Sequence, residues 1–193
     1  MSQTAVHPQQ ARTVTTVDRG TLDVRALVLL AVLLAAGFIL NMVVGKAIGG
    51  MTGNLIQPEF IISAFCLTIL IVHPSIPQAL VIGLISAAVI QLTTSSPFID
   101  FAAEGIAAMV MAGIVTATAG KGSAKFVPVA GTFVTTALSG IIFMLIKMVL
   151  SGAAAVMPLL TGMLPVVLLT AVFNAVLVGA LYLPIRKALK LND

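Results

Sequence analysis

The chain alternates between long apolar runs and short polar breaks. Six apolar runs can be drawn, at residues 24–44, 55–72, 76–93, 101–119, 126–150 and 162–184. An apolar run of about 18 residues or more is long enough to cross a hydrocarbon core of roughly 30 Å as a helix. The alternating segments of a membrane β-barrel are absent, and helices are the remaining way to satisfy backbone hydrogen bonds in lipid. The pattern predicts an all-α integral membrane protein, a six-transmembrane-helix bundle.

Composition supports the same class of protein. Hydrophobic residues make up 60% of the chain and charged residues 8%, whereas about a quarter of the residues in a soluble domain are charged. We expect one domain at residues 23–190, preceded by a flexible polar tail at residues 1–22. The single Cys66 excludes an intramolecular disulfide and a multi-cysteine metal site.

The basic residues predict the topology. With both termini in the cytoplasm, the outer side carries only Lys46 and Lys147. The inner side then carries Arg12, Arg19, Arg25, Lys121, Lys125, Arg186, Lys187 and Lys190. Such an excess of Lys and Arg on one side is typical of the cytoplasmic side of a membrane protein.

The densest polar break covers residues 91–104 and carries Asp100 and Glu104, two of the six acidic residues. Glu59 is expected about one turn inside the second span, in the same outer layer as Lys46 and Lys147. No ionisable residue is expected at mid-membrane, which argues against a proton or ion relay across the bilayer.

The outer layer has a structural and a functional interpretation. Acids in the first turn of a helix are stabilised by its dipole by up to ~1 kcal/mol each, so Asp100 is explained equally well as a cap. Glu104 lies deeper, where a charge costs roughly 2–3 kcal/mol or more, and therefore needs a partner or a ligand. Lys147 is either that partner, an anion binder, or a lysine whose ammonium group reaches the outer headgroups.

The candidate substrate-binding residues are the polar groups of this layer. They are Asn41, Asn54, Gln57, Glu59, Gln91, Thr94, Glu104 and Lys147. For Asn41 and Asn174 a hydrogen-bond pin between helices is favoured over contact with a ligand, because such pins are common in membrane bundles.

No motif of covalent catalysis, zinc hydrolysis or nucleotide binding occurs in the chain. We therefore expect no enzyme activity, no catalytic residue, no metal site and no cofactor in this chain. If ATP drives its activity, another chain hydrolyses the ATP.

Several short motifs resemble a known family. The first run reads RALVLLAVLLAAG from Arg25, and the last reads FNAVLVGALY from Phe173. Between them lie QPEF at 57–60, HPSIPQALVIG at 73–83 and LTTSSP at 92–97. Over residues 24–190 the chain resembles an S component, the substrate-binding subunit of an energy-coupling factor (ECF) transporter. Within that group it is most similar to the bacterial tryptophan-transport protein family.

The resemblance implies a function in the bacterial cell membrane. An S component captures its solute from outside, in a pocket in its outer half. It then associates with a transmembrane coupling subunit and two cytoplasmic ATPase subunits, and no nucleic acid is involved. Ala31 and Ala35 match the family's docking surface for the coupling subunit. The implied solute is tryptophan or a related amino acid, or a vitamin-like compound.

The aromatic content of the chain departs from the expectation for a site that binds an aromatic solute. The chain has no Trp and a single Tyr182, which lies near the inner end of the last run. The aromatic side chains expected in the outer half are Phe38, Phe60, Phe98 and Phe101.

Two other functions are compatible with a multi-span chain. A stand-alone secondary transporter driven by an ion gradient would need ionisable groups near the midplane and broken helices in inverted repeats. A non-transport membrane scaffold would use the small-residue stripes for a partner and the outer polar residues only as caps.

Overall fold

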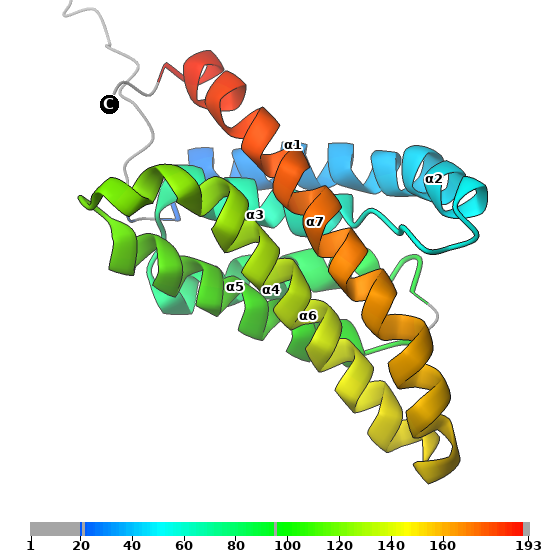
Figure 1. Ribbon diagram of the computed structural model, residues 1–193. Coiled ribbons are helices and arrows are strands. Elements are labelled where there is room, and N and C mark those ends of the chain that lie inside the picture. Colours follow the sequence, from blue (N-terminus) through cyan, green and yellow to red (C-terminus); the bar gives the residue numbers. More distant parts are fainter. Residues whose placement is uncertain (1–19, 21, 95, 191–193) are drawn as a thin grey trace, which may run out of the picture.

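The computed structural model describes residue 20, residues 22–94 and residues 96–190. Every regular element in this part of the chain is a helix (Figure 1). In chain order these elements are α1 (Val24–Leu40), the π-helical turn η1 (Asn41–Gly45), α2 (Lys46–Met51), α3 (Phe60–Val72), α4 (Ile76–Ile90), α5 (Ile99–Thr118), the 3-10 turn η2 (Gly122–Phe126), α6 (Val127–Ser151), the 3-10 turn η3 (Ala153–Ala155) and α7 (Val156–Ala188). The predicted tail at residues 1–22 falls mostly outside the described residues.

The first apolar run forms one continuous helix of 28 residues, Val24–Met51, made of α1, η1 and α2. Asp23 begins it, because its Oδ1 accepts a hydrogen bond from the Ala26 N–H at 2.8 Å. The sequence predicted an end at residue 44 and a glycine-rich connection at residues 45–54. The helix instead continues through Gly45 and Gly49, and the connection begins at Thr52.

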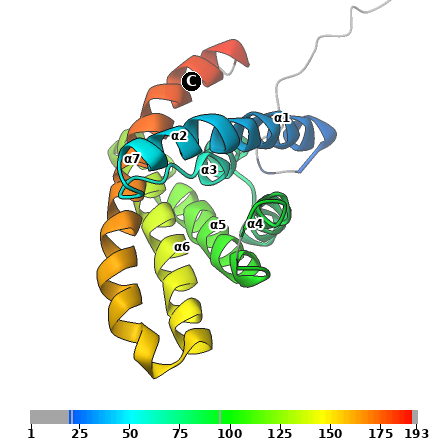
Figure 2. The same ribbon diagram turned by 90° about the vertical axis from the view of Figure 1, so that its right-hand side faces the viewer.

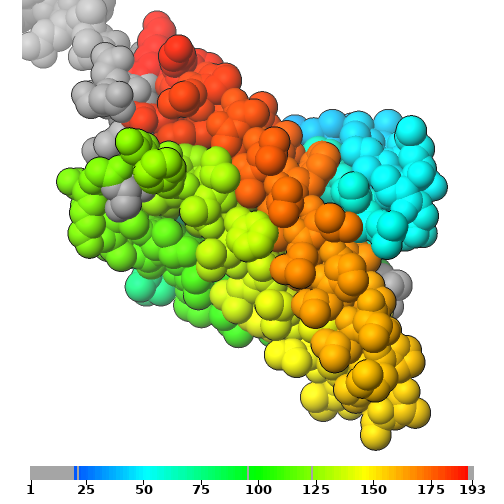
Figure 3. Space-filling view, in the orientation of Figure 1, coloured from blue at the N-terminus to red at the C-terminus, as the bar shows by residue number. Residues whose placement is uncertain are grey.

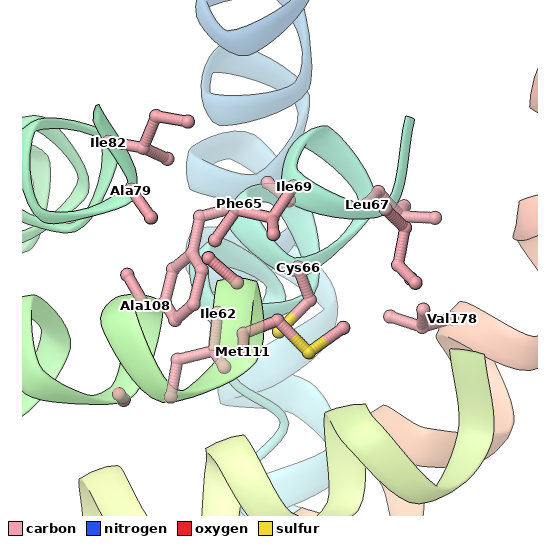
Figure 4. Packing of buried hydrophobic residues seen from close by; sticks show 14 of the residues in the cluster. Ile62, Phe65, Cys66, Leu67, Ile69, Ala79, Ile82, Ala108, Met111 and Val178 are labelled. Carbon is pink, nitrogen blue, oxygen red and sulfur yellow. The ribbon is translucent and has the colours of Figure 1, made fainter. Parts of the chain in front are cut away.

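Helix α3 is the centre of the molecule. All thirteen of its residues are buried, and it packs against α1, α4, α5, α6 and α7. Figure 4 shows Phe65, Cys66 and Ile69 of α3 surrounded by side chains of the neighbouring helices, among them Ile82 and Met111. The core of the bundle is therefore built around α3.

The start of α3 corrects the expected second span. That span was drawn from residue 55, but the helix begins at Phe60 and residues 55–59 are non-helical. Pro58 explains the difference, because proline lacks an N–H and disfavours helical backbone in the residue before it. Glu59 consequently precedes the helix and does not lie one turn inside it.

Helices α4 and α5 pack closely against each other at Gly83. A Cβ atom added to Gly83 would lie 2.6 Å from the Glu104 carbonyl oxygen and 2.9 Å from the Ala108 Cβ. Only a residue without a side chain allows this approach, so Gly83 determines how close the Glu104 turn of α5 lies to α4.

Helices α6 and α7 form a long antiparallel hairpin whose turn extends beyond the other helices (Figures 2 and 3). The run at 126–150 corresponds closely to α6. The last run was predicted too short, since α7 has 33 residues and is about 50 Å long at 1.5 Å per residue. Pro158 was expected in the connection, but it stands in the first turn of α7, where proline is tolerated.

Four helices are long and apolar enough to cross a membrane: 24–51, 99–118, 124–151 and 153–188. Helices α3 and α4, which were expected as spans, have 13 and 15 residues, or about 20 and 22 Å. The all-helical class of the prediction is thus confirmed, while the described helices contain four candidate spans by length and composition.

From the continuous helix Val24–Met51 onward, successive helices run in alternate directions, so the bundle has two distinct ends (Figure 1). One end holds the start of α1, the α3–α4 turn, the α5–α6 connection and the end of α7. At this end the Gly20 N–H donates a hydrogen bond to the Val72 carbonyl at 2.9 Å. This end is on the left of Figure 1, and α2 and the α6–α7 turn are on the right. The described basic residues of the left end are Arg25, Lys121, Lys125, Arg186, Lys187 and Lys190, and those toward the right end are Lys46 and Lys147.

Candidate functional site

A cavity of about 530 Å³ lies between α6, α7 and the ends of α4 and α5 that the polar break at residues 91–104 joins. Its volume lies within the range of roughly 300–1,000 Å³ typical of small-molecule sites. The polar side chains that line it are Asn41, Gln57, Glu59, Thr93, Thr94, Asp100, Glu104, Thr136, Ser139, Lys147 and Thr170. Most of the expected outer polar layer therefore meets in one space.

The larger apolar side chains that line the cavity come mostly from α6 and α7. They are Ile62, Ile90, Phe143, Leu159, Met163, Val166 and Val167. The aromatic side chains anticipated for this purpose do not line the cavity: Phe38, Phe60, Phe98 and Phe101 lie elsewhere. Phe60, for example, packs edge-on against Phe173 with 5.9 Å between ring centroids. Phe143 is the aromatic residue that faces the cavity.

Glu104 is the most enclosed acid of the site. Its side chain is only 3% exposed, and its Oε1 accepts a hydrogen bond from the Ser139 hydroxyl of α6 at 2.8 Å. Its Oε2 is buried and has no hydrogen-bond partner among the described residues. Burying a carboxylate oxygen without a donor is costly, so Oε2 needs a donor that the described residues do not supply.

Asn41 holds Glu59 and the start of α3 together. Its Oδ1 accepts from the Phe60 N–H at 2.8 Å, and its Nδ2 donates to Glu59 Oε2 at 3.2 Å. Asn41 is the first residue of the π-helical turn η1, a local widening of the helix that is frequent at functional sites. Asn41 is thus both a pin between helices and part of the cavity wall.

The extended segment before α3 is fixed from the other side by α7. The Thr170 hydroxyl donates to the Gln57 carbonyl at 2.9 Å, and Asn174 Nδ2 donates to the Glu59 carbonyl at 3.1 Å. Asn174 is fully buried and does not line the cavity. Of its two expected roles, hydrogen-bond pin or ligand contact, its contacts fit the pin. The Gln57 carbonyl thus gains a partner from α7, and the Glu59 carbonyl, which also accepts from the Ser63 N–H of α3 at 3.2 Å, gains a second one.

Gln91 organises the polar break at residues 91–104. Its Nε2 donates to Asp100 Oδ2 at 3.1 Å, and its Oε1 accepts from the Phe98 N–H at 3.0 Å. Gln91 does not line the cavity, but it holds Asp100 there. Thr94 lines the cavity and accepts from the Ser96 N–H at 3.2 Å.

Lys147 does not pair with Glu104, which was one of its expected roles. Ser139 takes that position, and it precedes Lys147 by eight residues, or about 12 Å along the axis of α6. The Lys147 ammonium instead lies 5.5 Å from the centre of the Phe143 ring, within the range of a cation–π contact. The lysine lines the cavity at a different level from Glu104.

Asn54 lies outside the site. It is exposed and adopts left-handed backbone with φ of 64°, and its carbonyl accepts a hydrogen bond from the Gln57 side chain at 3.3 Å. Of the eight candidate residues, six line the cavity: Asn41, Gln57, Glu59, Thr94, Glu104 and Lys147.

Several residues that line the cavity are not among the candidates predicted from the sequence. Asp100, which helix capping explained, is only 6% exposed and lines the cavity. Ser139 is another, although Ser139, Phe143 and Lys147 follow one another at intervals of four on a single face of α6. This spacing was the feature of the sequence from which Ser139 could have been predicted to share a face with Lys147.

Within the described ranges no three His, Cys, Asp or Glu side chains form a group that could hold a metal ion. No model of a known protein family, no curated protein and no solved structure matches the chain.

Proposed function

We propose that this chain is the substrate-binding membrane subunit of an ECF-type uptake transporter. The observation that carries the proposal is the cavity in an apolar helical bundle, which carboxylates, a lysine, neutral polar groups and apolar side chains line together. A concave site with a few convergent polar groups is the usual form of a small-molecule site. The resemblance of the sequence to S components points in the same direction.

In this proposal the chain crosses the bacterial cell membrane with six helical segments and both termini in the cytoplasm. The distribution of the described Lys and Arg residues supports this orientation, since the cavity lies at the end with fewer of them. The short helices α3 and α4 cross together with the non-helical residues beside them, which in the described part of the chain are 55–59, 91–94 and 96–98. The cavity then faces outward, where the solute is captured.

The solute is a small amphipathic molecule: tryptophan or a related amino acid, or a vitamin-like compound. Glu59, Glu104 and Lys147 provide complementary charges for a zwitterion. The amides and hydroxyls of Asn41, Gln57 and Thr94 provide hydrogen bonds, and Phe143 with the α7 side chains contacts the apolar part. A transmembrane coupling subunit and two ATPase subunits complete the transporter and hydrolyse the ATP.

Ala31 and Ala35 form the docking surface of α1 for the coupling subunit. Both side chains are exposed, so these two small residues are not buried by packing within this chain. Small residues allow close approach of a second helix in lipid, where packing drives association.

The direct test is solute binding by the purified protein in lipid nanodiscs without ATP. Thermal unfolding and titration calorimetry across amino acids and vitamins should identify a ligand, and mass spectrometry should find it in the purified sample. If no compound binds, the proposal is wrong. Counterflow in liposomes that contain only this chain would favour the stand-alone secondary transporter instead.

A further inference from the structure

We infer that Glu104 binds a protonated amine of the solute, so that the site accepts amine-bearing zwitterions and cations and rejects anions. The inference rests on the proposed function and names the residue that selects the class of solute. It follows from the charges that meet in the cavity and from the partners that each carboxylate already has.

The lining carries three carboxylates, Glu59, Asp100 and Glu104, and one ammonium group, that of Lys147. Two of the acids, Asp100 and Glu104, are one turn apart on the same face of α5. An anionic solute would add a further negative charge beside these three carboxylates, and like charges repel. A protonated amine reduces the imbalance, so the charge of the lining favours it.

Each of the three acids accepts a hydrogen bond from a neighbouring side chain through one oxygen atom, and Glu104 differs in the burial of its other oxygen. Asn41 donates to Glu59 Oε2, and Gln91 donates to Asp100 Oδ2. The second oxygen of neither Glu59 nor Asp100 is among the buried oxygen atoms without a partner. Glu104 receives one hydroxyl group from Ser139 through Oε1, and its buried Oε2 has no partner in the described part of the chain.

Glu104 and Lys147 also lie apart in the cavity, so the amine and the acidic group of a zwitterion can bind at different places. Ser139 and Lys147 are about two turns apart on α6, so the Glu104–Ser139 pair and the lysine lie at different levels of the cavity. Phe143 stands between these levels on the same face. A zwitterion with its amine at Glu104 can thus direct an acidic group toward Lys147 and an apolar group toward Met163 and Val166.

The test compares three forms of each of the common amino acids in nanodiscs: the amino acid, the amine without its carboxylate, and the 2-hydroxy acid without its amine. Calorimetry with wild-type protein should show binding of at least one amino acid. The matching 2-hydroxy acid should bind at least about tenfold more weakly, because it lacks the charged donor. The matching amine should retain measurable binding.

The variant Glu104→Gln keeps an oxygen acceptor for Ser139 and removes the charge. It should lose at least about tenfold in affinity for the amino acid and most of the preference over the hydroxy acid. A purely structural role of Glu104 would lower both affinities together and leave the preference unchanged. Asp23→Asn is the matched control, since it removes one carboxylate at the far end of α1 and asparagine preserves the helix cap.

The outcomes separate the two proposals. If a 2-hydroxy acid or a neutral vitamin binds wild-type protein as well as every amine-bearing solute does, the amine assignment is overturned and the proposed function stands. If sodium ions alone stabilise the wild type and not Glu104→Gln, Glu104 binds a metal cation and the assignment is again overturned. If nothing binds, both proposals fail. The wild-type comparison is decisive even if Glu104→Gln does not fold.

Discussion

The Ser139 hydroxyl donates a hydrogen bond to Glu104 Oε1 at 2.8 Å, and so joins α6 to α5 inside the cavity. Both side chains are almost completely buried. The bond is the only one that an oxygen of the Glu104 carboxylate makes within the described residues. The stability of the bundle and the geometry of the site therefore depend on the same contact.

Removing this donor should destabilise the protein. Ser139→Ala leaves the Glu104 carboxylate without its hydroxyl partner, which costs about 1–3 kcal/mol for a buried group. We expect a lower melting temperature in nanodiscs and weaker solute binding. Ser151→Ala, at the exposed end of the same helix, is the control and should change neither. Equal stability of Ser139→Ala and wild type would show that the bond contributes nothing.

Gly83→Ala should move the Glu104 turn away from α4. The added methyl group would lie 2.6 Å from the Glu104 carbonyl oxygen, and overpacking of this kind costs about 1–3 kcal/mol. Because Glu104 lines the cavity, solute affinity should fall together with the melting temperature.

Gly113→Ala on α5 is the matched control for this substitution, because nothing lies within 4 Å of a Cβ atom at Gly113. Alanine is favoured over glycine inside a helix by about 0.5–1 kcal/mol, so Gly113→Ala should be neutral or stabilising. If both variants behave alike, close packing at Gly83 does not position α5.

Asn41→Ala should weaken the junction between the first helix and α3. It removes the acceptor of the Phe60 N–H and the donor to Glu59, and loss of such bonds costs about 1–3 kcal/mol where a group stays buried. Solute affinity should fall because Glu59 loses its orientation. Asn54→Gly is the control, since Asn54 is exposed with φ of 64°, and glycine adopts this conformation readily.

The double variant Ala31→Leu with Ala35→Leu should separate binding from transport. Leucine is tolerated on an apolar, exposed face, so the isolated chain should keep its melting temperature and its affinity for solute. Uptake by cells that contain the whole transporter should fall, because the coupling helix can no longer approach closely. Ala180→Leu on the exposed face of α7 is the control. Loss of solute binding in the double variant would remove the docking assignment.

The sequence by itself determined the helical class and most helix positions, because the apolar runs and their proline and glycine breaks act locally. The run at 126–150 became α6 with one residue of difference at each end. Boundaries failed where local signals were ambiguous: Pro58 delayed the start of α3, and Pro158 was accommodated in the first turn of α7.

The tertiary structure decided which polar residues meet and what each one binds. The sequence placed Glu59, Glu104 and Lys147 in one layer, but it could not show that Ser139, 35 residues after Glu104, is the partner of that acid. It also could not show that Asp100 faces a cavity or that Phe143 is the aromatic side chain of the wall. Hydropathy predicts in which layer of the bundle a residue lies. Which side chain it contacts depends on how the helices are rotated and packed. The packing depends in turn on tertiary contacts such as that of Gly83 with Glu104.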